Sequence, residues 1–321
     1  LKPTKASGSE ALRGGPPPAR PDWPPCALRG LRSPGHLCSG CRAPGSAAME
    51  PASCGAQRLL VFGWGAAAEA VLHEAAEYQA KGEAVISCIS HVSQASDCDL
   101  REVCGRLGVA CTLCDGAEEV LSAAKAFAPD LIVSASYRKK LRPSVLELCP
   151  NRINFHPSLL PKHRGCWSGF WSILEGDTAT GVTCHRMVEE FDQGEILHQE
   201  RIAISPTDTS FSLYKRLLPV TKACARQVFA LHFGGGLPAG EPQAGPASYH
   251  YRCLPFGGLV QPEWSEEQVE RFIRAMHFPP YEGAAMLVAG QRVGVESLED
   301  YRRLQPGAAA AAQCAAASAG T

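Results

Sequence analysis

The chain of 321 residues lacks any apolar run close to the roughly 20 residues that a bilayer-spanning helix needs. The run AAAAAQCAAASAG near the C-terminus is too weakly hydrophobic to serve as one. Net charge is also nearly absent, at -1, so no overall attraction to nucleic acid or to an anionic membrane is expected. With 45% hydrophobic and 20% charged residues, the composition is typical of a globular protein without a membrane partner.

The 15 cysteines show no disulfide framework, because their number is odd and they are scattered through predicted strands and helices. This usage favours free thiols in a reducing compartment, and we expect a cytoplasmic protein. Two CxxC pairs occur, Cys38/Cys41 and Cys111/Cys114. Neither has a matching second pair or a nearby histidine, so the sequence predicts no zinc site and no bound metal.

Residues 1–55 have few acidic residues and no apolar periodicity, and they are dense in Pro, Gly and Arg. Such a segment cannot bury enough surface to offset its ordering entropy, so we expect a disordered tail. The Arg-rich balance resembles an organelle transit peptide, although the prolines oppose the helix that such peptides form. The alternative is that translation begins at Met49. A second disordered tail, rich in alanine, is expected at residues 305–321.

From residue 58 onward, strand-like and helix-like runs alternate. RLLVFG, AAAEAVLHEAAEYQAKG and EAVISCIS predict a β-α-β unit, and further strands include DLIVSAS and RINFH. These strands are apolar throughout, which is typical of a mostly parallel, Rossmann-like sheet with helices on both faces. GVTCHRMV and EILHQERIAI predict a final antiparallel pair. We therefore expect a catalytic domain at residues 56–233, a linker at 234–248 and a small α+β module at 249–304.

The stretch INFHPSLLPKHRG places Asn154 and His156 two positions apart at the end of a predicted strand. Their side chains would leave the same face, about 6.5 to 7 Å apart along the backbone. Asn and His at a strand end are also common turn formers, and the stretch alone leaves both interpretations open. Ser134–Tyr137 and Asp192 also follow strands, and ligands bind at the carboxyl ends of such open sheets. The sequence therefore predicts that these three elements meet in one site.

Three separated motifs carry a family resemblance: INFHPSLLPKHRG, GDTATGVTCHRMVEEFDQGEIL and DLIVSASYRKKL. Together they resemble the core of the folate-dependent formyltransferases, with the pattern Asn-x-His-x-Ser-Leu-Leu-Pro, then Gly-x-Thr, then Asp-x-Gly. The match covers residues 58–233. The later segment WSEEQVERFIRAMHFPPYEGA is similar to the start of the C-terminal module in methionyl-tRNA and nucleotide-sugar N-formyltransferases.

The resemblance implies a formyl transfer from 10-formyltetrahydrofolate to a primary amine, with no metal ion. It implies three catalytic residues: Asn154, His156 and Asp192. It implies a folate pocket formed by Ser134, Ala135, Ser136, Tyr137, Val188, Glu189, Glu190 and Phe191. We expect Ser158, Arg164 and Gly165 to shape the approach of the amine. His185 and His198 are expected to face solvent or to bond to the backbone.

Formyl transfer to an amine needs a hydrogen-bond donor and a proton acceptor, which Asn, His and Asp side chains can supply. When an amine attacks the formyl carbon, the formyl oxygen gains negative charge, and a preorganised donor there is worth on the order of 3 kcal/mol. Asn154 can supply a neutral N–H, and His156 a second donor if Asp192 favours the imidazolium. The amine must also lose a proton, which Asp192 or His156 could accept directly or through water.

A competing interpretation comes from GWGAAAEA, which fits Gly-x-Gly-x-x-Ala and could mark a dinucleotide site. The acidic ribose partner is missing, because the following strand ends in Ser90-His91. Gly63 and Gly65 could instead receive a phosphate-bearing substrate at a helix N-terminus.

The charge of the C-terminal module indicates which amine is the acceptor, since binding of tRNA requires positive charge. Its acidic residues outnumber its basic ones, which favours a small amine, such as a nucleotide-linked amino sugar, over initiator tRNA. Methionyl-tRNA formylation is the alternative, followed by 10-formyltetrahydrofolate hydrolysis and by a non-catalytic folate-binding role. No pattern in the sequence indicates an oligomeric state.

Overall fold

The computed structural model describes residues 55–95 and 97–305. The two expected tails lie outside the described residues, apart from Gly55 and Gln305 at their inner ends. Within the described ranges, no helix is both long enough and apolar enough to cross a membrane.

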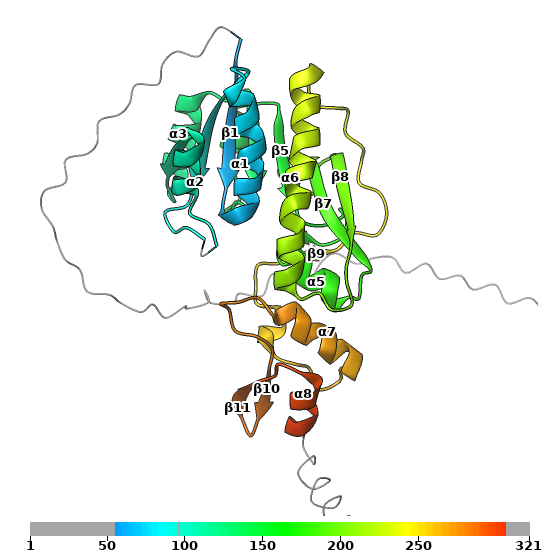
Figure 1. Cartoon of the computed structure of the whole chain (residues 1–321). Helices are drawn as coiled ribbons and strands as arrows, with labels where there is room; N and C mark the ends of the chain where they lie inside the picture. Colours follow the sequence, from blue (N-terminus) through cyan, green and yellow to red (C-terminus); the bar gives the residue numbers. More distant parts are fainter. Residues whose placement is uncertain (1–54, 96, 306–321) are drawn as a thin grey trace, which may run out of the picture. The chain divides into compact units, whose positions relative to one another are not determined.

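A seven-stranded sheet forms the core of the molecule, in the order β3-β2-β1-β4-β5-β7-β8 (Figure 1). Its strands are β1 (Gln57–Gly63), β2 (Ala84–Ser90), β3 (Ala110–Leu113), β4 (Leu131–Ala135), β5 (Arg152–His156), β7 (Ala179–Arg186) and β8 (Ile196–Ala203). The first five are parallel, whereas β7 and β8 are antiparallel to their neighbours. The predicted α/β class and the final antiparallel pair are confirmed.

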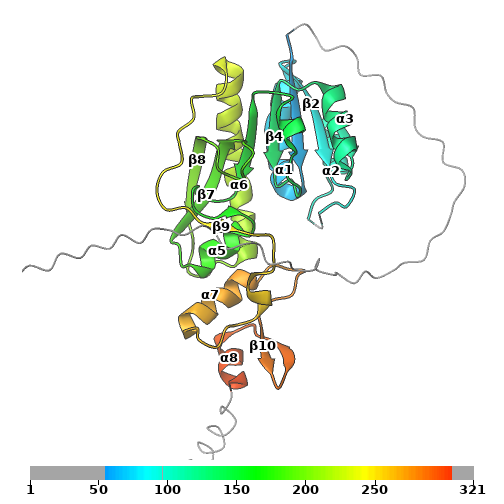
Figure 2. The same cartoon turned by 180° about the vertical axis from the view of Figure 1, so that it is seen from behind.

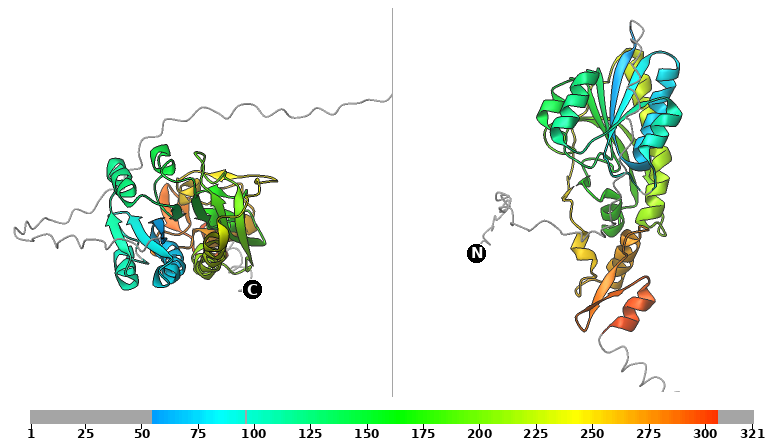
Figure 3. Two further views of the ribbon diagram at one scale, coloured as in Figure 1. Left: turned by 90° about the horizontal axis from the view of Figure 1, so that it is seen from above. Right: turned by 90° about the vertical axis from the view of Figure 1, so that its left-hand side faces the viewer.

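Helices cover both faces of the sheet (Figures 2 and 3). On one face lie α1 (Gly65–Ala80), α2 (Leu100–Leu107) and the long α6 (Ser210–Gly235). On the other lie α3 (Ala117–Phe127) and the short α4 (Pro143–Leu146). Because both faces are covered, β1 is fully buried from Leu59 to Phe62, which explains its uninterrupted apolar sequence.

The carboxyl ends of the central strands lie level with one another. In register across the sheet, Phe62 of β1 pairs with Ser134 of β4, which pairs with Asn154 of β5, which pairs with His185 of β7. This alignment carries the polar residues that follow β4 and end β5 to one edge of the sheet, as their positions in the sequence predict.

The C-terminal module consists of α7 (Glu266–Met276), the hairpin of β10 (Ala285–Val288) and β11 (Gln291–Gly294), and α8 (Leu298–Leu304), preceded by the short 3-10 helix η1 (Pro255–Gly258). It shares an apolar core with the sheet domain. Phe272 of α7 packs edge-on against Phe170 of α5 (Ser168–Leu174), with ring centroids 5.8 Å apart. The hydroxyl of Ser210 donates to the carbonyl of Ala275 at 2.5 Å.

The segment expected as a linker is tied to the sheet domain. Glu241 pairs with Ile196 at the start of β8. Immediately after the segment, β9 (Tyr249–His250) pairs with β6 (Arg164–Gly165), which follows the SLLP loop. The strands β6 and β9, which are about 85 residues apart in the sequence, therefore meet beside the end of β5.

Candidate active site

The carboxylate of Asp192 lies at the centre of a buried polar network. Asp192 is only 8% exposed, and it follows β7 in the loop toward β8. Its Oδ2 accepts the backbone N–H of Gly165 at 2.8 Å, and its Oδ1 accepts the side-chain N–H of Asn154 at 3.3 Å. The backbone of Asp192 is left-handed, with φ of 55°, which is tolerated better by Asp than by most residues. The predicted meeting of Asn154, His156 and Asp192 is therefore found in the geometry.

Both ring nitrogens of His156 face protein groups. Nε2 lies 2.8 Å from the carbonyl oxygen of His163, which can only accept, so Nε2 carries a proton. Nδ1 lies 3.5 Å from Oδ2 of Asp192, which is longer than a good hydrogen bond. A neutral His156 therefore points a lone pair toward Asp192, and a proton gained at Nδ1 would convert the contact into an ion pair.

His185 also belongs to the network, which the sequence did not indicate. It was expected to face solvent or to bond to backbone; it does bond to the carbonyl of Arg186, through Nδ1 at 2.8 Å, but it is only 1% exposed. Because Nδ1 donates there, Nε2 of the neutral ring is an acceptor, and it lies 3.1 Å from Nδ2 of Asn154. His185 thus fixes which end of the Asn154 amide is the NH₂ group.

The geometry around Asn154 allows one of its N–H groups to serve a ligand. Nδ2 lies 3.1 Å from Nε2 of His185 and 3.3 Å from Oδ1 of Asp192, and those two atoms are 3.3 Å apart. The triangle is nearly equilateral, so a single N–H can be shared by the two acceptors, and the second N–H then diverges from it by about 120°. Within residues 55–95 and 97–305, no further hydrogen-bond acceptor for this amide is found.

Burial and charge set the protonation states of His156 and Asp192. Burial lowers the pKa of His156 below its ordinary value, outweighing the opposite effect of Asp192. Burial alone would raise the pKa of Asp192, but His156, His185 and the N–H of Gly165 together hold that pKa well below the ordinary value. Near pH 7 the resting site therefore pairs an ionised carboxylate with a neutral imidazole.

Gln243 braces the site from the expected linker. Its side-chain N–H group donates to the carbonyls of Asp192 and Gly194, at 2.7 and 2.8 Å. Its oxygen accepts from Nε and from a terminal nitrogen of Arg164, at 3.0 and 2.6 Å. The Arg164 side chain is thus held against the Asp192 loop, and the backbone of Gly165 stays within reach of the carboxylate.

Gly165 is required by close packing. Its φ is +88°, and a Cβ built on it would lie 2.2 Å from the carbonyl oxygen of His250 in β9. No side chain fits there without separating β6 from β9. The glycine at this position lets its N–H approach Asp192.

Ser158 lies inside the loop and does not face the network. It is fully buried, and its hydroxyl donates to the carbonyl of Lys162 at 2.6 Å. The structure thus gives Ser158 a contact that stiffens the loop, rather than a contact with the Asp192 network.

Gly63 and Gly65 lie at the junction of β1 and α1. A Cβ on Gly63 would come within 2.5 Å of Cβ of Ala68, so this glycine allows close packing of strand and helix. A Cβ on Gly65 would lie 3.4 Å from Oδ1 of Asp97, whose other oxygen accepts the Tyr214 hydroxyl at 2.7 Å. A carboxylate beside the helix N-terminus disfavours a phosphate there, and neither glycine joins the Asp192 network.

His163 and His250 form a second polar group beside the network. Together with Glu175 they place ligand atoms within 4.8 Å of one another. The ring of His163 already contacts His250 at 3.1 Å and Asp177 at 2.9 Å, and His250 stacks on Trp171 at 4.2 Å. Burial, followed by the nearby His163, lowers the pKa of His250 to about 4. These contacts support a role in holding the loop behind His156.

The residues predicted as the two folate walls end or follow β4 and β7. Ser134 and Ala135 end β4 as buried residues, Ser136 has φ of 54°, and Tyr137 packs between Phe62 and His91. In the other wall, Val188 and Phe191 are 39% and 45% exposed, and Glu189 and Glu190 are exposed between them. The ammonium of Lys140, three residues beyond Tyr137, lies 5.5 Å from the ring centre of Phe191, so the chain that follows the first wall contacts the second.

Comparison with known proteins decides the family. The family model described as formyl transferase matches residues 57–228, more than half of the chain. The chain belongs to the formyl transferase family. It is therefore a formyltransferase, and the dinucleotide interpretation of the glycine motif is wrong, because that motif lies inside the matched region.

Two curated relatives match this formyltransferase closely, and solved structures share its fold. The relatives, from Brucella melitensis and Brucella abortus, are named GDP-perosamine N-formyltransferase; each is 43% identical over 197 residues, which is 61% of this chain and 75% of theirs. A sugar N-formyltransferase from Shewanella aligns with a TM-score of 0.62 at 18% identity, over 75% of this chain and 97% of that one. An N-formyltransferase from Helicobacter canadensis, in complex with folinic acid and dTDP-3-aminofucose, aligns with a TM-score of 0.60 at 17% identity, over 73% and 85%.

Proposed function

We propose that this formyltransferase moves the formyl group of 10-formyltetrahydrofolate to the primary amine of a nucleotide-linked amino sugar. The observation that carries the proposal is the network in which Asn154, His156 and Asp192 meet at the carboxyl end of β5. The names of the 43% identical relatives support a nucleotide sugar as acceptor. The folinic acid in the Helicobacter complex supports a folate as donor.

Asn154 stabilises the developing oxyanion in this proposal. As the amine attacks, the formyl carbonyl becomes a tetrahedral intermediate with negative charge on oxygen, and the unused N–H of Asn154 can donate to it. The amide is already fixed by His185 and Asp192, so the donor needs no reorganisation at the moment of reaction. The expected contribution is on the order of 3 kcal/mol.

His156 and Asp192 remove the proton of the attacking amine. Neutral His156 presents an unprotonated Nδ1 beside the carboxylate, and a proton taken up there forms an ion pair with Asp192 across 3.5 Å. Because both ring nitrogens face protein groups, the proton reaches this pair through Asp192 or through water. Collapse of the intermediate then breaks the bond between the formyl carbon and N10 of the folate, and N10 takes up a proton.

The folate would lie between the loops 134–137 and 188–191. Val188 and Phe191 offer exposed apolar surface to a flat heterocycle. Ser134 is level with Asn154 across the sheet, so a pterin at the end of β4 would bring its neighbouring formyl group toward Asn154. Arg164 and Gly165, on the opposite side of Asp192, would line the approach of the amine.

The C-terminal module disfavours tRNA as the acceptor. Five of its arginines form ion pairs within the module, with N···O distances of 2.6 to 3.8 Å. These pairs are Arg271–Glu267, Arg274–Glu270, Arg292–Glu282, Arg302–Glu266 and Arg303–Asp300. Since these charges are neutralised locally, the module presents little positive surface to a phosphate backbone.

The test is incubation of the purified protein with 10-formyltetrahydrofolate and separate acceptors: GDP- and dTDP-linked amino sugars, methionyl-tRNA, and water alone. We expect formylation of a nucleotide-linked amino sugar, with tetrahydrofolate released in equal amount. Formylation of methionyl-tRNA alone, or release of formate in water alone, would replace the proposal by the corresponding alternative. Folate binding without any turnover would indicate a non-catalytic protein.

A further inference from the structure

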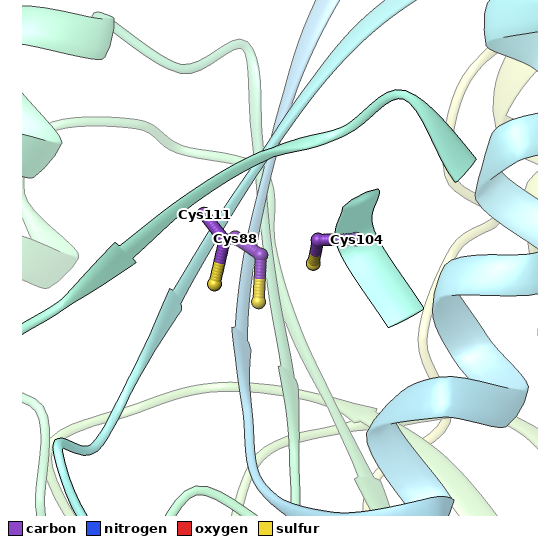
Figure 4. Close-up of side chains that lie close together, drawn as sticks. All are labelled: Cys88, Cys104 and Cys111. Carbon is purple, nitrogen blue, oxygen red and sulfur yellow. The ribbon is translucent and has the colours of Figure 1, made fainter. Parts of the chain in front are cut away.

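Three cysteines converge at the far edge of the sheet, away from the Asp192 network. Cys88 lies on β2, Cys111 lies on β3, and the two are paired in register. Cys104 lies on α2, which covers this face of the sheet. Their sulfur atoms all lie within 4.8 Å of one another (Figure 4). Among residues 55–95 and 97–305, no other three cysteines gather in this way.

The thiol of Cys111 does not pair with Cys114, its partner in the CxxC pattern of the sequence. Cys111 and Cys114 are three positions apart on an extended segment, so their side chains leave opposite faces. Cys114 packs into the core on the α3 side, whereas Cys111 packs on the α2 side. The partners of Cys111 are therefore the thiols of the neighbouring strand and helix.

The trio combines two buried thiols with one that is partly accessible. Cys88 and Cys104 have no exposed surface, and Cys111 lies at intermediate burial on the edge strand. Hydrogen bonds from Cys104 and then Cys88 lower the pKa of Cys111, and the same contacts with Cys104 and Cys111 raise the pKa of Cys88. We place the thiolate on Cys111 because it is the least buried of the three.

We propose that Cys88, Cys104 and Cys111 bind a thiophilic d¹⁰ metal ion of the Cu(I) class, with their three sulfurs as its ligands. Metal–thiolate bonds of about 2.3 Å place three sulfurs roughly 4 Å apart around one ion, which agrees with sulfurs gathered within 4.8 Å. A structural zinc site needs four protein ligands, and only three donors gather here among the described residues. Soft thiolates select Cu(I).

Binding requires deprotonation and no change of oxidation state. Cys88, Cys104 and Cys111 each bind as a thiolate, and the proton that each thiol gives up goes to solvent. The carboxylate of Asp99 and the guanidinium of Arg101 shift the pKa of Cys111 in opposite directions, and they form an ion pair with each other at 2.6 Å. The ion would connect β2, β3 and α2, and so would stabilise the edge strand of the sheet.

Anaerobic titration of the full chain with Cu(I), in competition with a chromophoric Cu(I) chelator, tests the proposal. The chain has 15 cysteines, so the readout is the difference between variants. Cys104→Ala should bind one equivalent less than wild type and lose the metal-dependent rise in melting temperature. Cys224→Ala is the control, because Cys224 is equally buried but lies outside the trio.

A residue-specific measurement completes the test. Iodoacetamide should label Cys111 readily in the metal-free chain, and one equivalent of Cu(I) should slow that labelling at least tenfold, as measured by mass spectrometry. This readout needs no variant, so it remains valid if Cys104→Ala does not fold. Equal Cu(I) binding by wild type and Cys104→Ala, or labelling of Cys111 unchanged by Cu(I), would overturn the proposal.

Discussion

The amide nitrogen of Asn154 lies 3.1 Å from Nε2 of His185, on the strand paired with its own. Neutral His185 accepts there, because its other nitrogen donates to the carbonyl of Arg186. The contact therefore orients the amide so that its NH₂ group faces Asp192 and the end of β5. His185 is a positioning residue for Asn154.

Replacement of Asn154 tests the oxyanion donor. Asn154→Ala should lower kcat by about 100-fold while folate binding stays nearly intact, because the lost interaction strengthens only in the transition state. Asn151→Ala is a matched control, since Asn151 precedes the same strand at the end opposite the site. Steady-state kinetics and folate titration give both quantities. A tenfold loss of folate affinity with unchanged kcat would assign Asn154 to binding instead.

Replacement of His185 tests the positioning role. His185→Phe should lower kcat by about 10- to 100-fold, because the Asn154 amide loses the acceptor that orients it. His185→Gln should retain more activity than His185→Phe, because the Gln oxygen can accept from the same amide. His198→Phe, on β8 and paired with Glu200 at 2.8 Å, serves as the control. Equal losses in the Phe and Gln variants would argue for packing rather than orientation.

Gly165→Ala should damage both stability and turnover. The new Cβ would collide with the carbonyl of His250 in a backbone conformation with φ of +88°. We expect the free energy of unfolding to fall by about 1–3 kcal/mol, and Asp192 to lose its N–H donor. Gly105→Ala in α2 has open space around its Cβ and should be neutral or slightly stabilising. Chemical denaturation of both variants makes the comparison, and similar stabilities would contradict the packing argument.

Acid should destabilise the protein partly through His232. Burial lowers the pKa of His232, and neither of its ring nitrogens has a partner among the described residues. The unfolded chain therefore binds this proton more readily, and stability falls as pH drops below about 6.5. His232→Leu should show a smaller drop in melting temperature between pH 7.5 and 5.5 than wild type. An equal drop in both proteins would show that His232 does not contribute.

Much of this structure follows from the sequence. The uninterrupted apolar runs predicted the parallel strands, and the helix-like run AAAEAVLHEAAEYQAKG forms α1 (Gly65–Ala80). Local pattern also located Asn154, His156 and Asp192, because each follows or ends a strand. The contacts of Gln243, His185 and the Cys88 trio could not be predicted, because they depend on pairing between segments that no local periodicity encodes. Gln243 in particular lies in a stretch rich in Gly and Pro, and this composition predicts a linker as readily as a segment that hydrogen-bonds to the Asp192 loop.

The most direct test of the proposed role of His156 and Asp192 is to measure kcat for His156→Ala, Asp192→Asn and the double variant. Melting temperatures are taken on the same samples. If the pair removes the amine proton as a unit, each single change should lower kcat by roughly 100-fold or more. The double change should then cost far less than the product of the single losses. If the residues only form a turn, each change would lower stability by about 1 kcal/mol and leave the folded enzyme fully active. Normal turnover with lowered melting temperature would contradict the account.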